Sequence, residues 1–231
     1  MAITLVAAGT YQLPVGSTVT PVAGGAYQAG DCLIIHVGES AGSGTLSTPS
    51  GWTLLTQGTN NQNHVFGKIA ASSSETIPGL TYSSGGSFAN GVLHIFRGVD
   101  SSLVDAGFTP TDRAGNNTTS VIGTTTAKTP TVDGALIILA GGHNKTSTSN
   151  GATVSAPAGF PMLGSLVPNG TQRTNGSCYQ IQTTATTVSG SQTMPISIAE
   201  SSASNMQSTI LSLAPALDII LHTRSLLGVG V

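Results

Sequence analysis

The sequence predicts an all-β fold, specifically a jelly-roll-like β-sandwich with an internal pseudo-repeat and a C-terminal arm. The apolar segments are short and lie between clusters of Gly, Ser, Thr, Asn and Pro, which is the pattern of strands joined by turns. Charged helix formers are scarce, because only 7% of the residues are charged, against about 25% in an ordinary soluble domain. One order of strands and turns also occurs twice along the chain.

The predicted strands follow from short apolar or alternating segments. They cover residues 3–7, 32–37, 53–57, 64–70, 92–97, 135–140, 162–166, 178–183 and 209–213. In one of them Val92, His94 and Phe96 share a face, and the opposite face is also partly apolar, which is typical of a central strand. Residues 135–140 form a continuous apolar run that suits a strand and is short for a helix.

Thr-rich connections leave the strand assignment open at two places. Residues 118–126 and 183–188 can form strands, because Thr favours a half-buried pleated surface. Residues 83–87 and 145–155 are instead predicted to be exposed loops, since Gly, Ser and Asn there favour turns.

An internal repeat relates the two halves of the chain. The first copy contains residues 30–35, 49–55, 64–70 and 91–97, and the second contains 133–138, 157–163, 177–181 and 208–213. In each copy a Pro-x-Gly turn precedes a large aromatic residue, Trp52 in the first and Phe160 in the second. Each set of about four strands has a face that it cannot bury alone, so the two sets are expected to pack together. Two sets of about four strands predict a sandwich of about eight strands.

The repeat also sets the predicted domain organisation. Residues 1–216 form a single β-sandwich domain with halves at about 1–105 and 130–216, joined by a Thr/Asn/Gly-rich link. Residues 217–231 are either a C-terminal arm or one more edge strand of the same domain.

Composition excludes several classes of function. The net charge is −2, so the chain lacks the basic surface that a nucleic-acid-binding protein uses to neutralise phosphates. No stretch reaches the 18 or so apolar residues of a membrane helix, and no partner membrane is expected. The N-terminus lacks the basic region of a signal peptide, so synthesis in a cytoplasm is expected.

The residues that carry chemistry elsewhere have simpler interpretations here. The five histidines match no metal-ligand spacing and are expected to be ordinary sheet residues, so neither a metal nor another cofactor is predicted. Cys32 and Cys178 are expected to be buried free thiols, with a disulfide as the open alternative. Asp100 and Asp105 are expected to cap a turn, with Arg97 and Asp100 forming an ion pair across it. No enzyme activity is predicted, because no nucleophile, general base and orienting group can be assigned together from the sequence.

Six short motifs follow one another in order. They are Gly-Asp-x-Leu-Ile at 30–34, Pro-x-Gly-Trp-Thr-Leu-Leu at 49–55, an apolar-x-Lys-Ile-Ala strand at 66–70, Arg-Gly-Val-Asp at 97–100, Asp-Gly-Ala-Leu-Ile-Ile at 133–138 and Ser-Leu-Ala-Pro at 212–215. In this order they resemble a β-sandwich module that is frequent in virion proteins of tailed bacteriophages, over roughly residues 1–216. The resemblance implies a structural or adhesive role in the virion, without catalytic residues. Because the chain lacks the long shaft of a typical tail fibre, the resemblance favours a small attached subunit.

The segment after Pro215 is the main candidate for interaction with other subunits. It is apolar but short and partly charged, which suits an arm that adds to a neighbour's sheet or groove. The candidate interface residues are Leu217, Ile219, Ile220, Leu221, Leu226 and Leu227.

The resulting functional expectation is a non-enzymatic capsid decoration or cement subunit. It would form a homo-oligomer, such as a trimer, and would bind the major capsid protein or other virion proteins. The alternative is a tail-attached receptor-binding module whose uncharged loops contact a host glycan. A free lectin or a polysaccharide-degrading enzyme is the third class.

Overall fold

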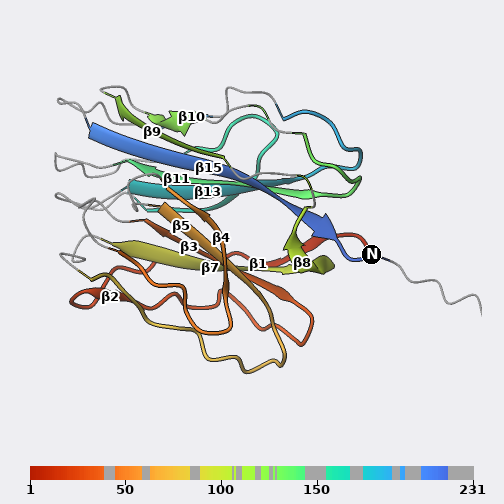
Figure 1. The fold of residues 1–231 in the computed structure, drawn as a ribbon, viewed down its shortest axis with the longest axis horizontal. Helices are drawn as coiled ribbons and strands as arrows, with labels where there is room; N and C mark the ends of the chain where they lie inside the picture. The colour runs from red at the N-terminus through yellow and green to blue at the C-terminus, as the bar shows by residue number, and fades with distance from the viewer. Residues whose placement is uncertain are drawn as a thin grey trace, which may run out of the picture.

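The computed structural model describes most of the chain and contains strands, turns and loops. The described residues are 1–38, 45–58, 63–83, 89–105, 107, 111–117, 121–124, 127, 129–143, 155–166, 174–188, 193–195 and 204–217. Within these ranges there is no helix, and the strands form two main sheets that pack face to face (Figure 1). The predicted all-β sandwich is therefore confirmed.

The strands of the first half are β1 (Thr4–Ala7), β2 (Thr18–Val19), β3 (Cys32–Gly38), β4 (Thr53–Gln57), β5 (Asn63–Ile69), β6 (Leu80–Thr81), β7 (Asn90–Arg97) and β8 (Val99–Val104). Those of the second half are β9 (Thr111–Asn117), β10 (Val121–Thr124), β11 (Leu136–His143), β12 (Met162–Leu166), β13 (Thr174–Ile181), β14 (Thr193–Pro195) and β15 (Ser204–Pro215). All nine predicted strands correspond to strands in this set.

Each main sheet is built almost entirely from one half of the chain. The first has five strands in the order β1-β7-β3-β5-β4, and the second has six, in the order β12-β13-β11-β15-β8 with β9 also paired to β15. Two-stranded ribbons, β2-β6 and β10-β14, complete the described sheets. The main sheets thus contain more strands than the eight or so expected, because β1, β8 and β9 extend the repeated units.

The register of the strands confirms the internal repeat. In the first half Cys32 pairs with Ile69 on β5 and with Phe96 on β7. In the second half Leu136 pairs in the same way with Ile181 on β13 and with Leu213 on β15. Consequently β7-β3-β5-β4 and β15-β11-β13-β12 have the same strand order with equivalent neighbours.

The Pro-x-Gly-aromatic turns of the two copies also have the same hydrogen bond. The amide of Trp52 donates to the carbonyl of Pro49, and the amide of Phe160 donates to the carbonyl of Pro157, each at 3.1 Å. The preceding glycine, Gly51 in one turn and Gly159 in the other, has a φ of 75° or 82° respectively. This left-handed backbone explains why a glycine occupies the position in both copies.

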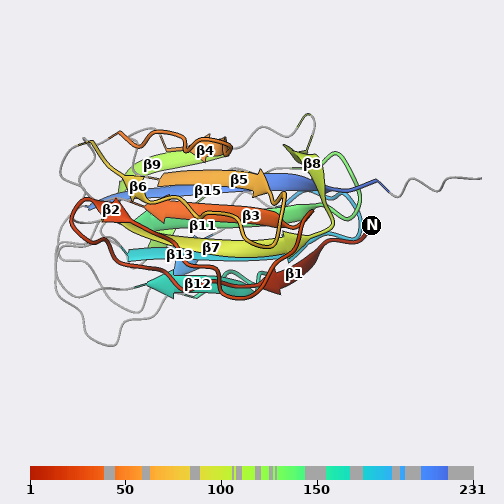
Figure 2. The same ribbon diagram turned by 90° about the horizontal axis from the view of Figure 1, so that it is seen from below.

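The two sheets stack as two copies related by a two-fold axis would. The equivalent strands β3 and β11 lie over each other, and β7 lies over β13 while β15 lies over β5 (Figure 2). Strand β7 in the first half is equivalent to β15 in the second, and β5 is equivalent to β13. The stacked pair β7–β13 is therefore equivalent to the stacked pair β15–β5.

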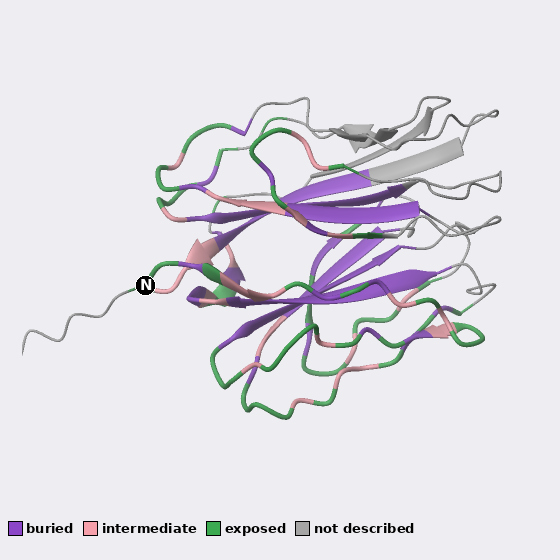
Figure 3. Cartoon of the chain, turned by 180° about the vertical axis from the view of Figure 1, so that it is seen from behind, coloured by how far each residue is buried: buried purple, intermediate pink, exposed green. Residues whose placement is uncertain are grey.

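The main hydrophobic core lies between the sheets. It joins Ile34 and Leu55 of the first half to the equivalent Ile138 and Leu163 of the second. Two further clusters cover the outer faces: one includes Leu33 and Phe66, and the other includes Ile137 and Phe160. The central strands are buried on both sides, as Figure 3 shows in purple, which explains their near-continuous apolar sequences.

The sequence missed several short or polar strands. Strands β2, β6 and β14 have only two or three residues, and β8 and β9 have the mostly polar sequences VDSSLV and TDRAGNN. The predicted strand 178–183 ends at Ile181, and of the Thr-rich stretches only the first contributes a strand, β10. Polar strands at a sheet edge need no apolar alternation, so their sequences resemble loops.

Candidate functional site

The two ends of the described chain meet at one end of the sandwich. The amino group of Met1 donates to the carbonyl of Ala216 at 2.8 Å, and the amide of Ala216 donates to the carbonyl of Gly98 at 2.7 Å. The next residue, Leu217, is 83% exposed. Of the predicted interface residues Leu217 is therefore placed at this end, which we call the terminal face.

The remaining predicted interface residues lie outside the described part of the chain. These residues are Ile219, Ile220, Leu221, Leu226 and Leu227. Their role as an arm stays a prediction, as does the choice between an arm and an extra edge strand.

A pocket of about 330 Å³ opens beside Pro215 and Leu217, at the end of the described chain. We call it the acidic pocket, because Asp100, Asp105 and Asp133 line it. Apolar groups line the rest of it, notably Val132 and Pro215 together with Leu217 itself. Residues from β8, from the turn before β11 and from the end of β15 thus form one recess.

The three carboxylates of the acidic pocket also organise the local backbone. Asp105 is 1% exposed and accepts hydrogen bonds from both the amide and the hydroxyl of Thr131. Asp133 accepts the Ala185 amide at 2.7 Å, and Asp100 accepts the Ser102 amide at 2.8 Å. The bond from the Ser102 amide lowers the pKa of Asp100, so this carboxylate is ionised at neutral pH.

A second pocket, of about 240 Å³, lies on the other side of Ala216. Arg97 donates two hydrogen bonds to Asp31 there, at 2.7 and 2.9 Å. Burial alone would raise the pKa of Asp31, but the bonds from Arg97 and from the Gln28 amide outweigh it and lower the pKa. The predicted Arg97–Asp100 ion pair is therefore wrong: the end of β7 directs the guanidinium toward the turn before β3.

Apolar side chains are exposed around both pockets. Met1 is 59% exposed, Val132 is 37% exposed, and Leu217 is 83% exposed. Single exposed apolar residues are common on protein surfaces, but here they lie around Leu217, the last described residue before an apolar stretch of sequence. The terminal face thus combines exposed hydrophobic groups with two recesses, one containing the ionised Asp100 and the other the Asp31–Arg97 ion pair.

A network of buried polar side chains lies at the opposite end of the inter-sheet core. His94 on β7 and Ser177 on β13 are hydrogen-bonded at 2.8 Å across the two sheets. Asn175 on β13 also donates to Asn90 at the start of β7. His36 lies 2.6 Å from the Tyr11 hydroxyl and 2.5 Å from Asn63 Oδ1. Each of these histidines is 1% exposed, so the network is sealed within the sandwich.

The His94–Ser177 pair has the wrong tautomer for nucleophilic catalysis. The Gly9 amide donates to His94 Nδ1 at 3.2 Å, so that nitrogen carries no proton. In the neutral ring the proton is then on Nε2, which donates to Ser177 Oγ. Burial, together with a smaller contribution from the nearby His36, lowers the pKa of His94 to about 3, so the neutral ring persists. A general base instead needs an unprotonated nitrogen facing the serine.

The cysteines are free and buried, as expected. Cys32 belongs to the cluster between the sheets, whereas Cys178 belongs to the outer cluster of the second half. They lie on opposite faces of their sheets and do not pair. Burial raises the pKa of the Cys178 thiol to about 12, which removes its nucleophilic form at neutral pH.

The histidines within the described ranges belong to strands. His36 and His94 face the inter-sheet core, while the His64 ring stacks on Phe66 with a centroid distance of 5.9 Å. Among the described residues no group of three or more His, Cys, Asp or Glu side chains is arranged to hold a metal ion. The described part of the chain also contains no helix long and apolar enough to span a membrane.

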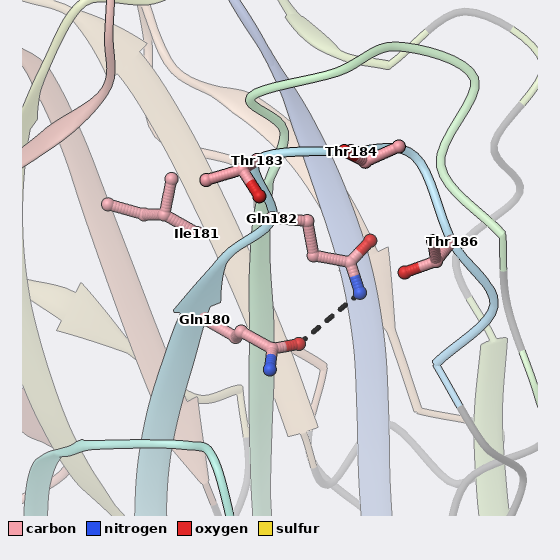
Figure 4. A pocket seen from close by; sticks show the side chains of 6 residues that line it. All are labelled: Gln180, Ile181, Gln182, Thr183, Thr184 and Thr186. Carbon is pink, nitrogen blue, oxygen red and sulfur yellow. Dashed lines mark hydrogen bonds between the residues drawn. The ribbon is translucent and has the colours of Figure 1, made fainter.

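A third recess, of about 270 Å³, is lined by uncharged polar residues where β13 ends. Its side chains are two glutamine amides, Gln180 and Gln182, and the threonines 183, 184 and 186, with Ile181 beside them (Figure 4). Gln182 Nε2 donates to Gln180 Oε1 at 3.3 Å. We call this recess the amide pocket.

Comparisons with known proteins give no match. No family model, curated protein or solved structure is similar to this chain at a significant level.

Sequence reasoning proposed Leu217 as an interface residue but missed the acidic pocket beside it. Asp133 and Val132 precede β11, and Asp100 lies in β8, more than thirty positions earlier. No local spacing connects these segments. The repeat is the one sequence feature that bears on this arrangement. It predicts that the first residues of each copy lie close to the end of the last strand of that copy.

Proposed function

We propose that this protein is a non-enzymatic structural subunit of a bacteriophage virion, in particular a capsid decoration or cement protein. It attaches to its neighbours through the terminal face and the C-terminal segment that leaves from it. Its partners are further copies of itself and the major capsid protein.

One observation carries the proposal: the apolar sequence after Leu217 begins at a face that itself exposes apolar side chains. Leu217 is 83% exposed at the base of that segment. Such a combination invites association, because apolar surface left in water is stabilised by being buried against a partner. The low charge of the chain, with 7% charged residues, also suits packing within an assembly.

The assignment to a phage virion is supported by the ordered motifs at 30–34, 49–55, 66–70, 97–100, 133–138 and 212–215. A protein that binds the assembled shell and not its free subunits shifts the equilibrium toward the shell by mass action. A stable sandwich with a sealed core is a suitable carrier for such a binding segment, and no chemistry is required of it.

Labelling intact particles with a gold-conjugated antibody against this protein tests the proposal. A regular label over the head is expected. Deleting residues 217–231 is expected to abolish binding to purified heads, because the segment provides the attachment. Absence of the protein from purified particles would refute the virion assignment.

A tail-attached receptor-binding module is the second candidate, and the amide pocket favours it. Neutral amides and hydroxyls, such as those of Gln180 and Thr183, match the hydrogen-bonding groups of an uncharged sugar. Label confined to the tail tip, together with glycan binding that survives deletion of residues 217–231, would select this candidate.

A further inference from the structure

The acidic pocket and the C-terminal segment have complementary chemistry. The pocket offers the carboxylates of Asp100 and Asp133 around apolar groups that include Val132 and Pro215. The fourteen residues after Leu217 bring the apolar run Ile219, Ile220 and Leu221, followed by the cationic Arg224. An apolar run followed by a cation fits an apolar recess with an acidic rim.

The segment is long enough to leave its own molecule. Fourteen residues span at most roughly 45–50 Å when extended. Residues 218–222 contain neither Gly nor Pro, and Ile219 and Ile220 are β-branched. Such residues favour an extended backbone, whereas filling the pocket of the same molecule would require a tight turn directly after Leu217.

The acidic pocket has an edge that suits an extended occupant. β8 is the last strand of the path β12-β13-β11-β15-β8, and two of its residues, Asp100 and Ser102, line the pocket. An extended segment lying along such an edge can add main-chain hydrogen bonds to the burial of its side chains.

We propose that the C-terminal segment of one copy occupies the acidic pocket of a second copy. The inference deepens the proposed function, because it names the subunit-to-subunit contact that the function requires. Ile219, Ile220 and Leu221 cover Val132, Pro215 and Leu217 of the recipient, and Arg224 pairs with its carboxylates. Every copy has one segment and one pocket, so the contact closes either a dimer or a ring.

The test uses full-length chains that carry a single defect. Val132→Glu places a charge in the pocket of the recipient, and Ile220→Glu places a charge in the segment of the donor. Because Val132 is 37% exposed, the substitution is expected to leave the fold intact. Val22→Glu is the matched control, since Val22 is 56% exposed at a distant turn.

Sedimentation velocity over a range of concentrations gives the readout. The wild type and Val22→Glu are expected to form the same oligomer, whereas each defective chain alone weakens association at least about tenfold. An equimolar mixture of the two defective chains is expected to form a heterodimer, because one intact segment still meets one intact pocket. Circular dichroism of each variant checks that the fold is retained.

Several outcomes would overturn the inference. One is a wild type that stays monomeric throughout the concentration range. Another is a Val132→Glu variant that associates as the wild type does. A mixture of the two defective chains that associates no better than either chain alone would contradict the exchange of segments between copies. These outcomes leave the proposed function standing if the protein is still found on particles, so the two failures are distinguishable.

Discussion

The two halves of this protein share a backbone plan but carry different side chains at equivalent positions. Across the inter-sheet core, β7 of the first half faces β13 of the second, and there His94 is hydrogen-bonded to Ser177. On the related side of the core β15 faces β5, and the equivalent residues are Leu211 and Val65, both in the hydrophobic cluster. One side is therefore held by a hydrogen bond and the other by apolar packing.

The difference shows that two side chains in contact have changed together between the halves, while the backbone of the repeat has stayed the same. If His94 faced a valine, its Nε2–H donor would be buried without an acceptor, and such an unsatisfied group costs free energy. The outer faces differ in the same way: Phe66 on β5 and Cys178 on β13 occupy equivalent positions but fill very different volumes. The predictions below use these equivalent positions as controls for each other.

The largest effect is expected at Phe66, which is compared with the equivalent Cys178 of the second half. Phe66 is fully buried, so Phe66→Ala should lower the free energy of unfolding by about 3–5 kcal/mol through lost burial and a cavity. Cys178→Ala removes a single sulfur atom and should cost about 1 kcal/mol. Urea unfolding measures both. Equal costs at the two positions would contradict the view that the first half depends on a larger side chain there.

The hydrogen-bonded pair should show strong coupling. His94→Leu alone leaves the Gly9 amide and the Ser177 hydroxyl buried without a partner, at a cost of about 2–3 kcal/mol. Adding Ser177→Val recreates the Leu–Val pair of the other side and should recover about 1 kcal/mol of that loss. A double-mutant cycle measured by chemical denaturation checks this. Additive costs would mean that the cross-sheet bond contributes nothing beyond packing.

The same histidine should make stability depend on pH. Its pKa is lowered from 6.5 to about 3 in the folded protein, so the unfolded chain binds more protons between these values. Stability is therefore full above pH 6.5 and decreases by up to about 1.4 kcal/mol per pH unit as the pH falls toward 3.

Denaturation of the wild type and of His94→Gln over pH 3 to 7 measures this contribution. In the variant, the slope of the free energy of unfolding against pH should be smaller by the contribution of one proton. Identical slopes in the two proteins would show that His94 already titrates normally in the folded state.

The smallest effect is expected at the Asp31–Arg97 ion pair, which the second half replaces by Ala135 and Ala214. The folded-state pKa of Asp31 is lowered below 3.8, so its contribution is present above that pH and is lost as the pH falls through the folded-state value. Asp31→Asn should lower the melting temperature slightly at pH 7 and progressively less as the pH falls below 3.8, with Asp133→Asn as the control. A deficit that persists at pH 2 would point to packing instead of charge.

Local sequence patterns predicted the fold well where strands are apolar and poorly where they are polar. Residues 32–37 and 135–140 were identified because both faces of a central strand are buried. Strand β8 was mistaken for a turn, because its backbone is held by β15 and by the Asp100 side chain instead of by an apolar pattern. Of the candidate site, sequence reasoning proposed Leu217 as an interface residue but missed the acidic pocket.

The sequence by itself determined the strand-forming segments, the tight glycine turns and the repeat, because each depends on residues close together in the chain. Only the tertiary structure decided which side chains meet: His94 with Ser177, Arg97 with Asp31, and Asp100 with Asp133 around one pocket. These pairs are separated by tens of residues, and no local periodicity records how one sheet is placed on the other. The stacking of the two sheets brings His94 to Ser177, while the pairing of strands within each sheet brings Arg97 to Asp31 and Asp100 to Asp133.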